Sequence, residues 1–143
     1  MNFRFLFYII FILVLFEKSL FSDEININSS KIKVLDEGNI ISALDVEVEI
    51  PNKNIEIEGD KSIYDKENSQ ITIINNVKFI DNLKNIYLEG EKVIYNQLTD
   101  LVQTFGKTFI RIEDKYYIYS NDLNYDRKLQ KNYTNRETVI KDK

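Results

Sequence analysis

Carboxylates and tyrosines form the groupings of this 143-residue chain that could do polar chemistry, and the sequence has neither histidine nor cysteine. Without histidine it lacks the commonest general base near neutral pH and the commonest zinc ligand. Without cysteine it forms no disulfide and no thiolate metal site. Its four glycines are scattered, which excludes a glycine-rich phosphate loop. Most hydrolase and metal mechanisms therefore lose a required residue.

Five aspartates are the candidates for a carboxylate pair or a calcium site. They are Asp60, Asp65, Asp81, Asp122 and Asp126. A carboxylate-only hydrolase of sugar polymers would need two acids about 5 to 10 Å apart in a cleft. Because these aspartates lie in or beside polar turn segments, we interpret them as solvated turn residues. We predict no enzyme activity, no cofactor and no metal.

Three tyrosines recur at nearly even intervals along the chain, at Tyr64, Tyr95 and Tyr125. Such a spacing suits a strand-end residue with a buried ring and a hydroxyl in water better than it suits a catalytic set.

The elements that must position these residues are strands. After residue 22, β-branched and aromatic residues alternate with polar ones, and short polar clusters interrupt them at 36–39, 51–54, 65–70, 81–85 and 96–100. Period-two alternation indicates half-buried strands, and the clusters have the composition of hairpin turns. One strand and turn recur about every 8 to 12 residues, a spacing that predicts an all-β fold.

A longer repeat overlies the strands. The segment NIEIEGDKSIY at 54–64 is followed by NIYLEGEKVIY at 85–95, at an offset of 31. A third copy, YYIYSNDLNY at 116–125, follows at an offset of 30, and the apolar pairs at 79–80, 109–110 and 139–140 are also 30 apart. With a more divergent unit at 31–50, the pattern predicts about four stacked β-hairpin repeats.

The N-terminal segment has the pattern of a signal peptide. Arg4 precedes twelve consecutive apolar residues at 5–16, which Glu17 and Lys18 close. The run is shorter than the roughly 20 apolar residues that span a bilayer, so we predict a signal peptide at 1–22, with an uncleaved anchor as the alternative. Its removal takes away two bases and one acid, leaving 17 basic and 22 acidic residues. That acidic balance argues against a nucleic-acid partner.

The repeats resemble the OstA-like family of lipopolysaccharide-transport proteins over roughly residues 25–142. The residues that carry the resemblance are EGNIISALDVEVEI at 37–50, NIEIEGDKSIYDKENSQITIINNVKFID at 54–81 and NIYLEGEKVIYN at 85–96. Within the family, the tyrosine-ended units and the ending ETVIKDK look most like the N-terminal periplasmic domain of the outer-membrane assembly protein LptD. The bridge protein LptA is second and the anchored LptC third.

The resemblance implies an open β-jellyroll over 23–143, folded like a V, whose apolar interior shields the acyl chains of lipid A. The groove candidates, taken as alternate residues of successive strands, are Ile57, Ile63, Ile73, Phe79, Leu88, Ile94 and Phe109. A closed β-sandwich with an ordinary core is the alternative. Because Phe79-Ile80 and Phe109-Ile110 are adjacent apolar pairs, the sequence leaves the register open.

Unpaired sheet edges are the second candidate site, since a free edge invites association unless charge blocks it. The edge-docking candidates are Ile25, Ile27, Ile32 and Val34. The resemblance implies a periplasmic protein with three kinds of partner: lipopolysaccharide, other jellyrolls of the transport bridge, and an outer-membrane barrel if the chain belongs to LptD. The alternative function is a structural periplasmic adaptor that binds protein through its strand edges without lipid.

Overall fold

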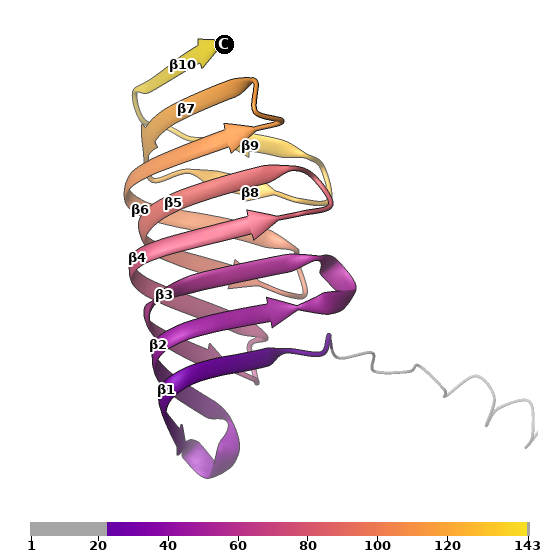
Figure 1. Cartoon of the computed structure of the whole chain (residues 1–143), viewed down its shortest axis with the longest axis vertical. Coiled ribbons are helices and arrows are strands. Elements are labelled where there is room, and N and C mark those ends of the chain that lie inside the picture. Colours follow the sequence, from indigo (N-terminus) through magenta and orange to yellow (C-terminus); the bar gives the residue numbers. More distant parts are fainter. Residues whose placement is uncertain (1–22, 143) are drawn as a thin grey trace, which may run out of the picture.

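The computed structural model describes residues 23–142, and the predicted signal peptide at 1–22 lies outside the described residues. Within this range, ten strands form one antiparallel sheet (Figure 1). The elements are β1 (Asn26–Leu35), the 3-10 turn η1 (Asp36–Gly38), β2 (Ile40–Ile50), the 3-10 turn η2 (Pro51–Lys53), β3 (Ile55–Asp65), β4 (Gln70–Asp81), β5 (Ile86–Asn96), β6 (Leu101–Ile112), β7 (Tyr116–Asn121), β8 (Asn124–Asp126), β9 (Lys131–Tyr133) and β10 (Thr138–Asp142).

The sheet is a stack of hairpins in sequence order. Strands β1 to β6 each pair with the next, β10 pairs with β7, and β8 pairs with both β6 and β9. The connecting turns use left-handed residues at equivalent places: Asn54 and Asn85 at one set of turns, Ser69 and Asp100 at the other, with φ between 50° and 59°. Asn and Asp tolerate this conformation well. Asn54 and Asn85, like Ser69 and Asp100, are separated by the 31-residue offset of the sequence repeat. Each repeat unit therefore forms its turns with the same backbone geometry.

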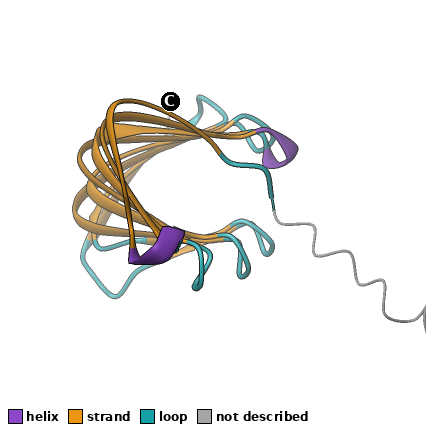
Figure 2. Ribbon diagram, turned by 90° about the horizontal axis from the view of Figure 1, so that it is seen from below, coloured by secondary structure: helices purple, strands orange, loops and turns teal. Residues whose placement is uncertain are grey.

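Each long strand bends near its middle. Asp45 in β2, Asn75 and Asn76 in β4, and Gly106 in β6 are left-handed there, and the pairing registers shift at the same level. Figure 2 shows the strands curving into a C. The bends divide the sheet into wall 1 (26–29, 46–50, 55–59, 77–81, 86–90, 108–112, 116–120, 138–142) and wall 2 (31–35, 40–44, 61–65, 70–74, 92–96, 101–105, 124–126, 131–133).

The core lies between the two walls. Phe79 of wall 1 packs on Tyr95 of wall 2, with ring centroids 6.2 Å apart. The buried apolar residues are mostly isoleucine and valine, as expected of strands whose inner face is dry. The predicted all-β open jellyroll is confirmed. In residues 23–142, we find no helix with the length and apolar character needed to cross a membrane.

Candidate functional site

The apolar interior between the walls is the candidate functional site. A row of directly paired residues crosses wall 1 from β2 to β7, and all but the last are fully buried: Val48, Ile57, Phe79, Leu88, Ile110 and Ile118. The corresponding row of wall 2 is Ala43, Ser62, Ile73, Val93 and Thr104. The interior is therefore a continuous apolar strip that crosses successive strands, with a small share of hydroxyl groups on wall 2.

The structure places four of the seven groove candidates inside and three outside. Ile57, Ile73, Phe79 and Leu88 face the interior and are 0% exposed. Ile63, Ile94 and Phe109 lie on the outer face, in the opposite alternation class from the buried residues of their strands. The predicted inward orientation of these three residues is wrong.

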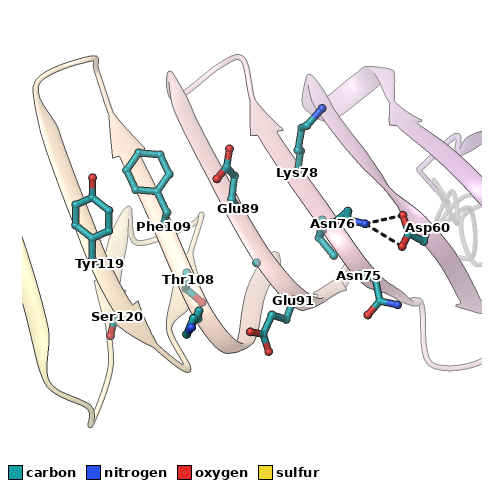
Figure 3. Close-up of a pocket in the computed structure, with 13 residues that line it drawn as sticks. Asp60, Asn75, Asn76, Lys78, Glu89, Glu91, Thr108, Phe109, Tyr119 and Ser120 are labelled. Carbon is teal, nitrogen blue, oxygen red and sulfur yellow. Dashed lines mark hydrogen bonds between the residues drawn. The ribbon is translucent and has the colours of Figure 1, made fainter.

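Phe109 faces outward because it lies one place short of the structural counterpart of Phe79. Phe79 pairs with Leu88, and Leu88 pairs with Ile110, so Ile110 is that counterpart. Phe109 pairs instead with Glu89, which is opposite Lys78 on the outer face (Figure 3). A one-residue slip moves a side chain to the other face of a sheet. The repeated Phe-Ile pair therefore gives the wrong register.

Ile63 and Ile94 face outward because the bend changes the alternation within a strand. In β5, the inward positions are even-numbered up to the bend, as at Leu88, and odd-numbered after it, as at Val93. Strand β3 also changes at its bend, from odd-numbered inward positions, as at Ile57, to even-numbered ones, as at Ser62. An irregularity in mid-strand re-aims every side chain that follows it. Strict alternation across the whole strand therefore predicts one wall correctly and inverts the other.

The N-terminal end of the interior is hollowed. A cavity of about 350 Å³ lies between the walls there, lined by Ile25, Ile27, Ile41 and Tyr64 together with Asp23, Lys66 and Ser69. Its apolar members are half-buried, in contrast to the fully buried residues in mid-stack. The interior is therefore accessible at this end.

The four edge-docking candidates lie at this same end. Ile27, Ile32 and Val34 belong to β1, which forms the free edge of the sheet, and Ile25 directly precedes it. Ile32 pairs with the buried Ala43 and therefore faces inward, yet it is 49% exposed because no further strand covers it.

The C-terminal end repeats this arrangement. Strand β10 is the other free end of the main strand order. Its Ile140 pairs with the inward-facing Ile118 and is 65% exposed. Both ends of the stack thus present a strand with one unpaired edge and with uncovered inward-facing apolar side chains.

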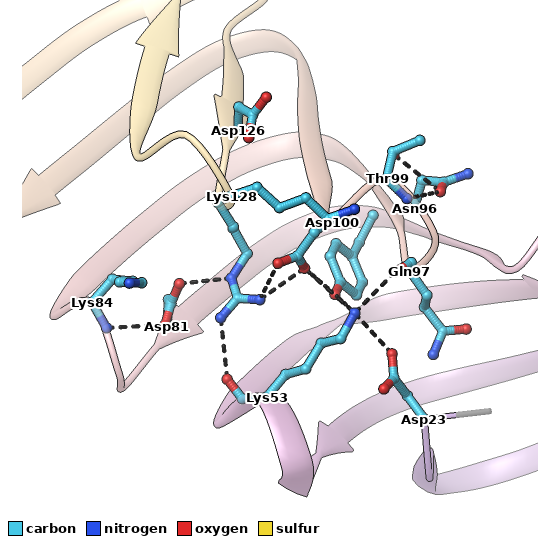
Figure 4. A network of polar contacts seen from close by, with 12 residues as sticks. Asp23, Lys53, Asp81, Lys84, Asn96, Gln97, Thr99, Asp100, Asp126 and Lys128 are labelled. Carbon is cyan, nitrogen blue, oxygen red and sulfur yellow. Dashed lines mark hydrogen bonds and ion pairs between the residues drawn. The ribbon is translucent and has the colours of Figure 1, made fainter. Parts of the chain in front are cut away.

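The two rows of turns form rims that face each other across the open side of the C, which we call the mouth. Arg127, on the rim of wall 2, is 5% exposed. Its Nε donates to Asp81 Oδ2 of wall 1 at 2.7 Å, its Nη1 donates to Asp100 Oδ1 at 2.8 Å, and its Nη2 donates to the Lys53 carbonyl at 3.1 Å. One guanidinium therefore joins two turns of wall 1 to a turn of wall 2 (Figure 4).

Lys53 makes a second connection across the mouth. From the η2 turn of wall 1, its Nζ donates to the Gln97 carbonyl at 2.9 Å and to the Tyr95 hydroxyl at 3.0 Å, both on wall 2. It also pairs with Asp23 at 2.8 Å. The tyrosine hydroxyls complete the set: Tyr95 donates to Asp100 Oδ1 at 2.6 Å and Tyr125 to Asp81 Oδ2 at 3.0 Å. We call Lys53, Asp81, Tyr95, Asp100, Tyr125 and Arg127 the rim network.

The electrostatics of the rim network favour its charged form. Burial opposes ionisation of Asp100, but the Tyr95 and Arg127 hydrogen bonds and the charges of Arg127 and Lys53 outweigh it, and the pKa of Asp100 is lowered. Burial likewise opposes the charge of Arg127, and Asp81 and Asp100 reverse that effect, so the pKa of Arg127 is raised. Burial raises the pKa of Tyr95 and Tyr125, as do the adjacent carboxylates, which keeps both hydroxyls as donors.

The rim network corrects two predictions. Asp81 is not a solvated turn residue, because it is 0% exposed and bonded to Arg127 and Tyr125. The Tyr95 and Tyr125 hydroxyls are not in water, because they donate to carboxylates. One sequence signal for Arg127 was available. Arg127 is two residues after Tyr125, so strand alternation places both on one face, and the equivalent positions of the earlier repeat units are Lys66 and Gln97.

The other candidate carboxylates serve bends and turns. Asp60 accepts from the Asn76 amide, Asp65 from the Asn68 amide, and Asp126 from the Leu129 backbone. Asp122 accepts from the Gly106 backbone at the last bend. Across residues 23–142, His, Cys, Asp and Glu side chains nowhere group in threes as metal ligands.

The outer face of wall 1 carries an aromatic cluster that the sequence did not reveal. Phe109 has Tyr87, Tyr117 and Tyr119 around it, with ring centroids 5.1 to 6.4 Å apart. Arg111 stacks on Tyr87. A hollow of about 860 Å³ beside this cluster is lined by Phe109 and Tyr119 and by charged residues such as Lys78 and Glu89 (Figure 3).

Comparison with known proteins agrees with the fold. No protein-family model matches the chain, and no curated protein sequence matches it. Among solved structures, the chain is similar to LptH of Pseudomonas aeruginosa, described as the LptA-homologous periplasmic component of the conserved lipopolysaccharide transport device. The TM-score is 0.70 at 13% sequence identity, over 83% of this chain and 96% of LptH. The chain therefore has the β-jellyroll fold of that protein.

Proposed function

We propose that the chain is a periplasmic lipopolysaccharide-transport protein whose interior shields the acyl chains of lipid A. The observation that carries the proposal is the apolar interior, whose row from Val48 to Ile118 leads toward uncovered strands at both ends. Each shielded CH₂ offsets about 0.8 kcal/mol of the cost of leaving a membrane, so the gain grows with the length of acyl chain that the interior covers. The fold of LptH and the resemblance of the repeats support the same assignment.

The mode of assembly is the second part of the proposal. We infer that the free edges of β1 and β10 join to neighbouring jellyrolls, so that the interior continues from one molecule to the next. Val34 and Ile140, inward-facing and 62% and 65% exposed, would be covered at such a junction. The unpaired edges of these strands supply backbone donors and acceptors for the contact. An adaptor that binds protein through these edges without lipid is the competing function.

Among family members, a bridge component such as LptA is the counterpart that the likeness to LptH favours, because the match spans 96% of that chain. Membership of LptD, with its outer-membrane barrel, remains the prediction made from the tyrosine-ended units. Reading the gene past Lys143 tests it, since a barrel in frame would identify LptD.

Site-specific photocrosslinking tests the cargo. A benzophenone amino acid replaces Phe79 or Leu88 in the interior, and Phe109 on the outer face serves as a matched aromatic control. In cells that make lipopolysaccharide, we expect crosslinks to lipopolysaccharide from the two interior positions and not from Phe109. Folded variants that give no interior crosslink, while positions in β1 or β10 crosslink to protein, would establish the adaptor instead.

A further inference from the structure

The rim network lies between the apolar interior and water. Beneath it, Phe79 and Tyr95 from opposite walls are in contact and fully buried. At its surface, the Lys53 and Asp100 side chains keep 20% and 16% of their area exposed. A ligand with its apolar part between the walls and its polar part in water has to pass this boundary.

The backbone hydrogen bonds of the turns run along each rim. On wall 1, the Asn82 amide donates to the Asn54 carbonyl at 3.0 Å. On wall 2, the Gln97 amide donates to the Ser69 carbonyl, and the Arg127 amide to the Asp100 carbonyl. Across the mouth, the described contacts are those of side chains, chiefly Arg127 and Lys53. The rims can therefore separate without breaking the strand ladder of either wall.

The bends provide the place where such a motion is absorbed. They lie on the side of the C opposite the mouth (Figure 2), where Asn75 and Asn76 are left-handed and the pairing of β4 with β5 is interrupted between Ile74 and Val77. A hinge needs only a few residues that absorb the change in backbone angles. On either side of the bends the ladders of β3 to β6 are continuous, so we expect each wall to move as one unit.

We propose that Arg127, anchored to Asp100 on its own rim, holds the mouth closed through Asp81 and the Lys53 carbonyl of wall 1, and that separation of Arg127 from these two groups admits an amphiphile sideways between the walls. The identity of the amphiphile rests on the proposed function, whereas the closure by Arg127 does not. The charges at the mouth are Arg127, Lys53, Asp81, Asp100 and Asp23, all on the boundary where the head group of the amphiphile would lie.

Pulsed electron paramagnetic resonance tests the closure, since the sequence has no cysteine and labels can be placed freely. Nitroxides at Leu83→Cys on the wall 1 rim and Leu129→Cys on the wall 2 rim, both 64% exposed, report the width of the mouth. Leu98→Cys with Leu129→Cys, both on wall 2, is the control pair. We expect Arg127→Met to shift the cross-mouth distances to longer values and leave the control pair unchanged.

Two further variants keep the test decisive. Arg127→Lys keeps a charge beside Asp81 but loses the fork that also reaches the Lys53 carbonyl of wall 1, and it should widen the mouth less. Arg136→Met removes an exposed guanidinium paired with Asp122, and it should have no effect. If Arg127→Met does not fold, Arg127→Lys carries the test. Unchanged distances in a folded Arg127 variant would overturn the proposal.

Uptake of fluorescent lipid A from micelles separates the closure from the cargo. We expect uptake by Arg127→Met to be several-fold faster than by the wild type or by Arg136→Met. Longer distances without uptake in any variant would support closure and refute lipid A as cargo. Equal uptake by all variants with unchanged distances would support the cargo and refute closure.

Discussion

Phe79 and Phe109, which occupy matching places in the sequence repeat and are each followed by isoleucine, lie on opposite faces of the sheet. Phe79 fills the interior against Tyr95, and Phe109 stacks among tyrosines on the outer face of wall 1. The pair therefore offers a direct comparison of one side chain in two environments of one fold.

Truncation of these phenylalanines should give unequal losses. We expect Phe79→Ala to lower the free energy of unfolding by about 3 to 5 kcal/mol, because a fully buried ring leaves a cavity. Phe109→Ala should cost about 1 to 2 kcal/mol, because its contacts with three tyrosines lie on the outer face. Urea unfolding followed by circular dichroism measures both. Equal losses would contradict the assigned register.

Two glycines at equivalent repeat positions should respond differently to alanine. A Cβ at Gly59 would collide with the buried Ile73 side chain and lie 3.1 Å from the Asn75 carbonyl oxygen, whereas at Gly90 its nearest neighbour is Val93 at 3.5 Å. We expect Gly59→Ala to cost about 1 to 3 kcal/mol, and Gly90→Ala to be tolerated. Thermal unfolding of the two variants provides the check, and a larger loss for Gly90→Ala would refute it.

Loss of the Arg127 guanidinium should lower the free energy of unfolding, and a second substitution at Asp81 should restore much of it. Arg127→Met leaves the buried Asp81 without its cationic partner, for which we expect a loss of about 3 to 5 kcal/mol. Asp81 pairs directly with Ile55 and Ile86, so Asp81→Ile in the same chain should restore much of the loss. Denaturant titration compares the single variant, the double variant and Arg136→Met. A double variant no better than the single one would contradict this reasoning.

Acid should weaken the rim network in a defined direction. Because the pKa of Asp100 in the folded chain lies below its ordinary value of 3.8, its contribution to stability is fully present above that value and is lost as the pH falls through the lowered pKa. We expect the stability difference between the wild type and Asp100→Asn to be constant from pH 7 to 5 and to shrink below pH 4. Urea titrations across this range measure the difference. A difference that grows in acid would contradict the assignment.

Strands, turns and repeat were predictable because each depends on local sequence: period-two alternation, polar turn clusters and a recurring tyrosine. The faces of Ile63, Ile94 and Phe109 were not, because a mid-strand bend or a one-residue difference in offset inverts the pattern without changing composition. The ion pair of Arg127 with Asp81 could not be predicted from the sequence for another reason. The two residues are 46 positions apart and meet because the sheet folds back on itself.

The turns of each rim also bear on how such molecules vary in length. The Asn54 and Ser69 carbonyls accept hydrogen bonds from the backbone amides of Asn82 and Gln97 in the next unit. Successive units are therefore joined by the same kind of turn-to-turn contact. Duplication or deletion of one repeat unit would then change the span of the sheet by two strand spacings, about 9.6 Å. The length of the sheet can therefore change in whole hairpin units while the contact between neighbouring units stays the same.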